Sequence, residues 1–124
     1  MKEDIKQKWV AALCSGEYEQ GRGFLKHFGE YCCLGVLCDI AAKEGIVSVE
    51  EVSGTEENPG VISYDGAWDV LPSSVVEWSG IVTNTGHIPS GVPTYCGTFT
   101  NLAELNDLTK LNFDGLADVI EQRF

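Results

Sequence analysis

The sequence has few basic residues, and this shortage restricts what the chain can bind. Eight lysines and arginines stand against nineteen aspartates and glutamates among 124 residues, which gives a formal net charge of −11. A surface with that charge repels the phosphate backbone of DNA or RNA. We therefore expect no nucleic acid among its partners.

Long hydrophobic runs are also missing. No apolar stretch approaches the roughly 20 residues that a membrane-spanning helix requires. The first residues, MKEDIKQKWVAAL, alternate charged and apolar side chains, whereas a secretory signal places a basic segment before a continuous hydrophobic one. We expect no membrane partner and a cytoplasmic location, and a single domain, because a chain of this length supplies one hydrophobic core but not two.

The sequence contains no CxxC pair, the spacing used by most structural zinc sites. It has five cysteines, of which Cys32, Cys33 and Cys38 lie within seven residues, and two histidines, His27 and His87, outside any H-x3-H pattern. We expect neither a metal nor a cofactor. An odd number of cysteines and an adjacent pair fit a reducing compartment, so we interpret all five as free thiols.

Apolar residues at helical spacing indicate where the helices lie. The pattern predicts helices over residues 3–14, 34–45 and 73–80, and two more at the C-terminal end of the chain. The first of that last pair begins at Asn101, which forms a capping-box signal with Glu104.

Turn residues between short aromatic and β-branched runs predict strands. GRGFLKHFGEYCC contains a hairpin centred on Gly29, and VISYDGAWDV a second one with Asp65 and Gly66 in its turn. We expect an acidic loop at about residues 50–60 and an irregular loop at about 82–99, which is rich in glycine and proline. The fold class predicted is α+β, with a small antiparallel sheet packed against N-terminal, central and C-terminal helices.

The turn Gln20–Gly23 is the first candidate for a binding site. Its QGRG sequence places the glycine backbone amides of Gly21 and Gly23 beside the guanidinium of Arg22, a combination that suits phosphate oxygens. Residues 1–26 carry a net charge of +1 and the remainder −12, so an anionic ligand is expected near this turn. The alternative is a plain turn, since glycine supplies the positive φ angles that turns need.

Other side chains complete this candidate ligand site. Trp68 offers an aromatic face on which a nucleotide base can stack. Asn106 and Asp107 end a predicted helix, where they either satisfy the helix terminus or form hydrogen bonds with a ribose hydroxyl or a base edge.

The cysteines permit two interpretations. A thiol at the first turn of a helix has a lowered pKa, so Cys33 is a candidate nucleophile with His87 as its base. Alternatively Cys32, Cys33 and Cys38 are small core residues, and Gly35 lets the helix approach the sheet. We favour the packing interpretation and a protein without catalytic activity.

The order of the segments SGEYEQGRGFL, YCCLGVLCD, LPSSVVEWSGI and LAELND resembles a family of small bacteriophage proteins. The most specific matches are the motif around Gln20–Gly23, the residues Cys32–Asp39 and the Leu105–Asp107 motif. In similar proteins we would expect a basic residue where this chain has Cys14.

By analogy of size and genomic setting, the resemblance implies a phage anti-defence protein. Such a protein would bind and sequester a small nucleotide immune signal, such as the cyclic ADP-ribose molecules of Thoeris defence, as a homodimer in the host bacterial cytoplasm. Two alternatives stay open: a cysteine-dependent hydrolase, and an acidic interaction protein that inhibits a host partner.

Overall fold

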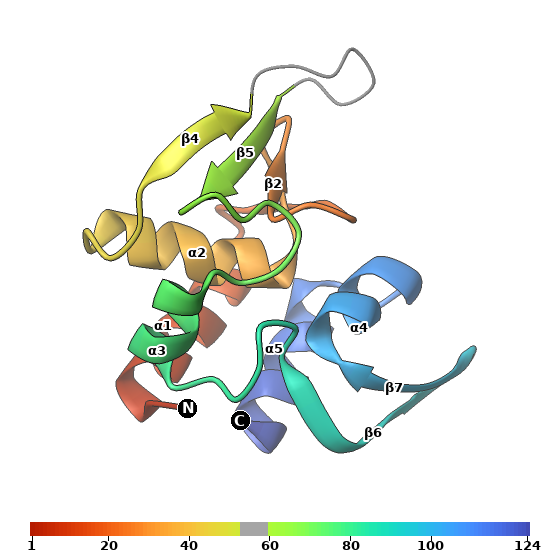
Figure 1. Ribbon diagram of the computed structural model, residues 1–124. Helices are drawn as coiled ribbons and strands as arrows, with labels where there is room; N and C mark the ends of the chain where they lie inside the picture. The colour runs from red at the N-terminus through yellow and green to blue at the C-terminus, as the bar shows by residue number, and fades with distance from the viewer. Residues whose placement is uncertain (53–59) are drawn as a thin grey trace.

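The computed structural model describes residues 1–52 and 60–124 (Figure 1). Residues 53–59, which make up most of the expected acidic loop, lie outside the described residues. The helices are α1 (Glu3–Cys14), α2 (Cys33–Lys43), α3 (Ser73–Ser79), α4 (Leu102–Leu108) and α5 (Phe113–Arg123). The strands are β1 (Glu19–Gln20), β2 (Lys26–His27), β3 (Glu30–Tyr31), β4 (Val49–Val52), β5 (Val61–Tyr64), β6 (His87–Thr94) and β7 (Gly97–Asn101).

The helices confirm the sequence pattern closely. The side chain of Asn101 accepts a hydrogen bond from Glu104 N at 2.9 Å and begins α4 as the capping box predicted. Asn112 does the same for α5 by accepting from Gly115 N at 3.0 Å. None of the helices in the described part of the chain is both long and apolar enough to cross a membrane.

The larger sheet has the strand order β1-β3-β2-β5-β4. The hairpin predicted around Gly29 is present, because β2 and β3 pair in antiparallel fashion across it. The sheet is mixed rather than purely antiparallel, since β1 joins β3 in parallel. The α+β class is confirmed, with helices and small sheets around a single core cluster.

The second predicted hairpin is only half present. β5 forms as expected, and Asp65 and Gly66 make the turn after it, but beyond the turn only an isolated bridge joins Tyr64 to Ala67. Trp68 does not continue a strand. β5 pairs instead with β2 and β4, which occupy both of its edges.

The prediction of an irregular loop at 82–99 is wrong. Most of this segment forms the hairpin of β6 and β7, a separate two-stranded sheet. The pairing shifts register between His87 and Val92, where Ser90 and Gly91 have φ angles of 65° and 67°. Glycine and proline, which we interpreted as loop residues, here form a bulge within a strand.

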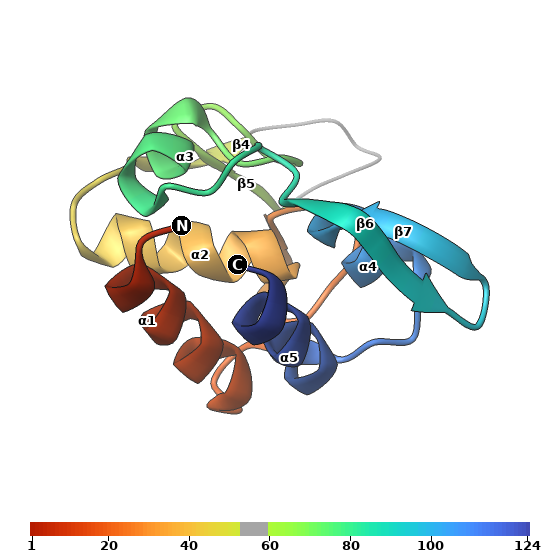
Figure 2. The same ribbon diagram turned by 90° about the horizontal axis from the view of Figure 1, so that it is seen from below.

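Helix α2 lies at the centre of the molecule, with α1 and α5 side by side on one flank (Figure 2). Its residues from Cys33 to Cys38 are all buried. The indole Nε1 of Trp9 in α1, itself fully buried, donates to Cys33 O at 2.9 Å. Gly35 confirms the predicted close approach, since a Cβ at this position would lie 1.7 Å from Leu25 O.

Candidate functional site

Two segments far apart in the sequence meet at one place. Gln20 ends β1, and Asn106 lies near the end of α4. The Gln20 Nε2 donates to Asn106 Oδ1 at 3.1 Å and to Leu111 O at 3.1 Å. The structure thus brings the predicted site residues of the QGRG turn together with Asn106 and Asp107.

Asn106 is the centre of this junction and has no exposed surface. Its Nδ2 donates to Gly21 O and to Asp107 Oδ1, both at 2.9 Å. Its Oδ1 accepts from Gln20 Nε2 and from Cys33 N, the latter at 3.2 Å. A side-chain amide has two N–H donors and two lone pairs, so this one has no capacity left for a ligand and acts as a positioning residue.

The hydrogen bond that Cys33 N donates to Asn106 caps the start of α2. The first N–H groups of a helix have no partner within the helix, and Cys33 is the first residue of α2. Asn106 satisfies this N–H, and the Cys32 Sγ accepts from Gly35 N at 3.4 Å. The start of α2 is therefore capped from its own sequence and from α4.

The backbone amides of the QGRG turn are occupied by groups of the chain itself. Gly21 N donates to Tyr31 O at 2.7 Å, and Gly23 N donates to Asp107 Oδ1 at 3.1 Å. Arg22 is exposed, and one N–H of its guanidinium donates to Thr109 O at 3.3 Å. The two glycine amides are therefore not available to a ligand, and the exposed group of this turn that could pair with an anion is the Arg22 guanidinium.

A row of aromatic rings begins directly after this turn. Phe24 lies between Trp68 and His27, with ring centroids 5.7 Å and 4.8 Å apart, and Phe28 follows His27 at 4.3 Å. We call Phe24, His27, Phe28 and Trp68 the aromatic row. Trp68 is 44% exposed and Phe28 67% exposed, so the row offers flat apolar surface to the solvent.

Backbone pairing places Trp68 in this row. Leu25 N donates to Trp68 O at 2.8 Å, which fixes the segment after β5 beside the one before β2. The sequence analysis identified Trp68 but not Phe24 or Phe28. The available signal was the aromatic-rich FLKHF run that follows the QGRG turn.

The clustered cysteines are core residues, as the packing interpretation predicted. Cys32 is 4% exposed, and Cys33 and Cys38 have no exposed surface. Burial raises the pKa of Cys32 to about 12 and that of Cys33 well above its ordinary value. His87 is exposed, and the Cys33 Sγ contacts Leu102 O at 3.8 Å.

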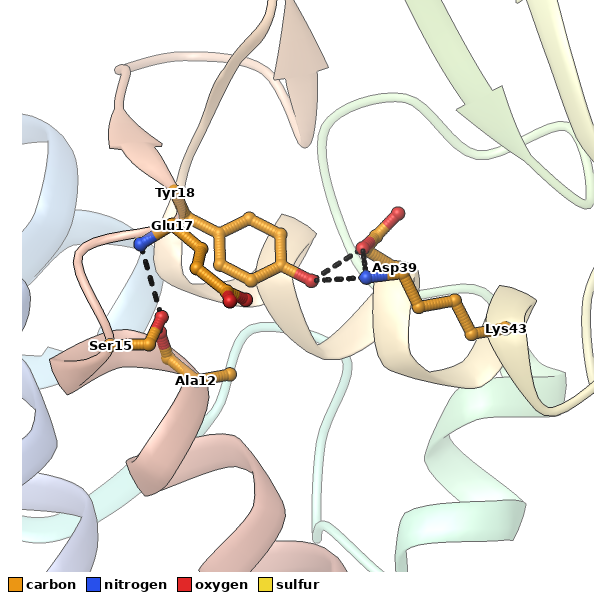
Figure 3. A network of polar contacts seen from close by, with 6 residues as sticks. All are labelled: Ala12, Ser15, Glu17, Tyr18, Asp39 and Lys43. Atoms are coloured by element: carbon orange, nitrogen blue, oxygen red, sulfur yellow. Dashed lines mark hydrogen bonds and ion pairs between the residues drawn. The ribbon is translucent and has the colours of Figure 1, made fainter.

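The segment before Gln20 is fixed by a polar network that the sequence analysis missed (Figure 3). Tyr18 Oη donates to Asp39 Oδ2 at 2.5 Å and accepts from Lys43 Nζ at 3.2 Å. Lys43 and Asp39 also form an ion pair at 3.2 Å. Burial, together with the Asp39 carboxylate, raises the pKa of Tyr18. In the sequence, the signal for this network was the i, i+4 spacing of Asp39 and Lys43, which favours an ion pair along a helix.

A second feature lies where α1 meets α5. A groove of about 280 Å³ is lined by Cys14, Tyr18, Gln20 and Asp114, among other residues. Cys14 is exposed, and its pKa is raised by partial burial and by the carboxylates of Asp114 and Asp118. This chain therefore has a thiol beside the Asp114 carboxylate at the position where we expected a basic residue in similar proteins.

Within the described residues, no three His, Cys, Asp or Glu side chains are grouped so that they could hold a metal ion. A family model described as a domain of unknown function, DUF8296, matches residues 1–124. The chain belongs to the DUF8296 family. No curated protein and no solved structure matches it.

Proposed function

We propose that this DUF8296 chain is a non-catalytic binding protein for a small nucleotide-type ligand. The observation that carries the proposal is the aromatic row, with Trp68 and Phe28 exposed and Arg22 two residues before its first ring. A base would stack on the row, and the guanidinium would contact a phosphate.

The chemistry of these groups supports this assignment. Stacking of a base on an aromatic ring contributes about 1–3 kcal/mol and works with any base. Arginine pairs with phosphate through two parallel N–H bonds. The turn also belongs to residues 1–26, which have a net charge of +1 in an acidic chain, so an anion meets the least repulsion here.

Asn106 and Asp107 contribute indirectly to this site. They hold the carbonyl of Gly21 and the amide of Gly23. The turn that carries Arg22 is therefore fixed relative to α4, and less conformational entropy is lost when a ligand binds.

The position of Cys33 does not support a thiol-dependent hydrolase. A nucleophilic cysteine needs a lowered pKa and access to its substrate. Cys33 has a raised pKa and no exposed surface.

The biological role that we propose follows from binding without catalysis. A protein that captures a signal molecule in the host bacterial cytoplasm needs affinity and abundance but no reaction. Together with the resemblance to small phage proteins, this favours an anti-defence protein that sequesters a nucleotide immune signal of the cyclic ADP-ribose type.

Isothermal titration with cyclic ADP-ribose isomers and cyclic dinucleotides tests the proposal. We expect one of these to bind, and Trp68→Ala to weaken its binding by about tenfold or more, since each 1.4 kcal/mol is tenfold in affinity. Arg22→Ala should weaken it similarly, whereas Lys8→Ala, which removes a cation that pairs with Glu44 on the helical surface, should leave the affinity unchanged.

Two results would overturn the assignment. The absence of heat with every nucleotide tested would remove the ligand class. Binding that survives both Trp68→Ala and Arg22→Ala would remove the site.

A further inference from the structure

The β6–β7 hairpin and the connection from α4 to α5 form a surface of unusual composition. Residues 78–103 contain no aspartate, glutamate, lysine or arginine, although the whole chain has a net charge of −11. Two large apolar side chains are exposed at this end of the molecule: Tyr95, 69% exposed at the hairpin turn, and Leu108, 60% exposed at the end of α4.

A groove of about 360 Å³ lies between the hairpin and the α4–α5 connection. Its apolar lining comes from β6, from the hairpin turn, from the α4–α5 connection and from α5. We define the hairpin patch as this lining together with Leu108: Val92, Pro93, Tyr95, Leu108, Leu111 and Val119. Lys110 also lines the groove, with its Nζ 5.4 Å from the centroid of the Tyr95 ring.

The hairpin that carries the patch is bound to helix α5 through Arg123. Arg123 of α5 donates to Pro89 O at 3.3 Å and to Gly91 O at 3.1 Å. Figure 2 shows the hairpin extending beyond the helices on the side of α4. An apolar surface at this end of the molecule is therefore fixed to the C-terminal helix rather than free to fold back over the core.

We propose that the hairpin patch is the interface through which two copies of this chain form a symmetric dimer. In such a dimer the same surface patch meets itself. An acidic surface would then face an identical acidic surface, and like charges in contact cost several kcal/mol. The hairpin patch reduces this cost because neither the residues that line the groove nor residues 78–103 include an acidic side chain.

The same charge argument selects a second copy over a basic partner. A basic protein would be attracted to the acidic remainder of the surface, where it gains electrostatic energy. The hairpin patch gives such a partner no charge complementarity. Large apolar side chains clustered on a surface are typical of protein contacts.

The dimer is held by side-chain packing rather than by pairing of strands. β6 contains Pro89 and Pro93, and proline lacks the N–H that a neighbouring strand would need. The Arg123 guanidinium also occupies two of its carbonyl groups. These features oppose strand addition along β6, so contact through β6 would be made by its apolar side chains.

This proposal does not depend on the ligand. The aromatic row lies on β2 and in the segments beside it, whereas the hairpin patch belongs to the β6–β7 hairpin, the α4–α5 connection and α5. Arg22 is the point where the two come nearest, since its guanidinium donates to the carbonyl of Thr109, which lines the groove. A chain that dimerises without binding nucleotides, or binds them as a monomer, would separate the two proposals.

Sedimentation equilibrium of the full chain tests the interface. We expect a dimer, and Tyr95→Glu and Leu108→Glu should each weaken self-association by at least tenfold, because each places a charge against its own copy. Val82→Glu is the matched control. Val82 is 80% exposed, precedes β6 and is not among the residues that line the groove. This control should dimerise like the unmodified chain.

Cysteine labelling gives a second readout that does not require mutation. Cys96 is exposed beside the hairpin patch, with its Sγ 3.8 Å from Leu108 O, and Cys14 is exposed on α1. Maleimide labelling is followed by peptide mapping. As the protein concentration rises, the labelling rate of Cys96 should fall relative to that of Cys14. A monomer at all concentrations, or a dimer that Tyr95→Glu and Leu108→Glu leave intact, would overturn the proposal.

Discussion

Replacing Asn106 by aspartate tests whether the junction between α4 and the QGRG turn holds the fold together. The substitution keeps the size of the side chain and the acceptor oxygen that receives Cys33 N. It removes the two bonds that Nδ2 donates to Gly21 O and Asp107 Oδ1, and it places a second carboxylate at hydrogen-bonding distance from Asp107.

The expected loss is large. An acceptor that loses its donor away from water costs about 1–3 kcal/mol. Gly21 O loses the Asn106 donor, whereas Asp107 Oδ1 keeps the bond from Gly23 N, so we expect about 2 kcal/mol before the repulsion between carboxylates is added. That is a substantial part of the 5–15 kcal/mol that typically stabilises a domain. Urea unfolding at pH 7, followed by circular dichroism, measures it.

The pH dependence of the loss provides a second test. Burial and the Asp107 carboxylate raise the pKa of the introduced carboxyl in the folded state above its unfolded value of about 3.9. When protonated the carboxyl can donate one of the lost bonds, so the destabilisation should be smallest below about pH 4. It should grow as the pH rises through the folded-state pKa.

Asn112→Asp is the matched control. The side chain of Asn112 caps α5 in an exposed position, where aspartate is as good a cap as asparagine. This variant should stay within about 0.5 kcal/mol of the unmodified protein. A loss below about 1 kcal/mol for Asn106→Asp, or a loss independent of pH, would refute the reasoning.

Three further predictions concern the core and the groove. Gly35→Ala should destabilise the chain by about 3 kcal/mol or more in urea unfolding, because its Cβ would meet the backbone of Leu25 at 1.7 Å; a neutral effect would contradict that contact. Cys14→Lys should stabilise it by about 0.3–1 kcal/mol at low salt, because the cation would lie at the end of α1 near Asp114; a gain that persists in 1 M NaCl would have another cause. Iodoacetamide near neutral pH should label Cys14 but leave Cys32 unmodified, since burial raises the pKa of Cys32 to about 12; fast labelling of Cys32 in the folded protein would contradict this.

The helices could be predicted from the sequence because their signals are local. The 3.6-residue period of apolar side chains and the caps at Asn101 and Gly80 depend on residues within one or two turns. The boundaries of α1 were predicted as residues 3–14, which are those observed.

The β6–β7 hairpin could not be predicted in the same way. Its strands contain proline and glycine, whose local preferences favour loops. They form strands because the bulge at Ser90 and Gly91 absorbs the irregularity, and because Arg123, from the other end of the chain, binds the carbonyl of Gly91. A short window of sequence cannot predict tertiary contacts of this kind.

The candidate site was predicted in part. The residues of the QGRG turn and the Asn106–Asp107 pair were selected separately, and no local pattern indicated that they contact one another across more than 80 residues. The amides that we expected to bind phosphate are satisfied inside the chain, as the bond from Gly23 N to Asp107 shows. The ring of Phe24 joins Trp68 to the turn only after folding.

The cap on α2 has a consequence for how this chain folds during synthesis. The N–H of Cys33 is paired with Asn106, 73 residues later, and α1 packs along α5, the last helix. The central helix therefore cannot complete its N-terminal cap, and the first helix cannot cover its apolar face, until α4 and α5 have left the ribosome. Because contacts between such distant residues slow folding, this domain is expected to fold as one unit once all of its helices are present rather than in stages from its N-terminus.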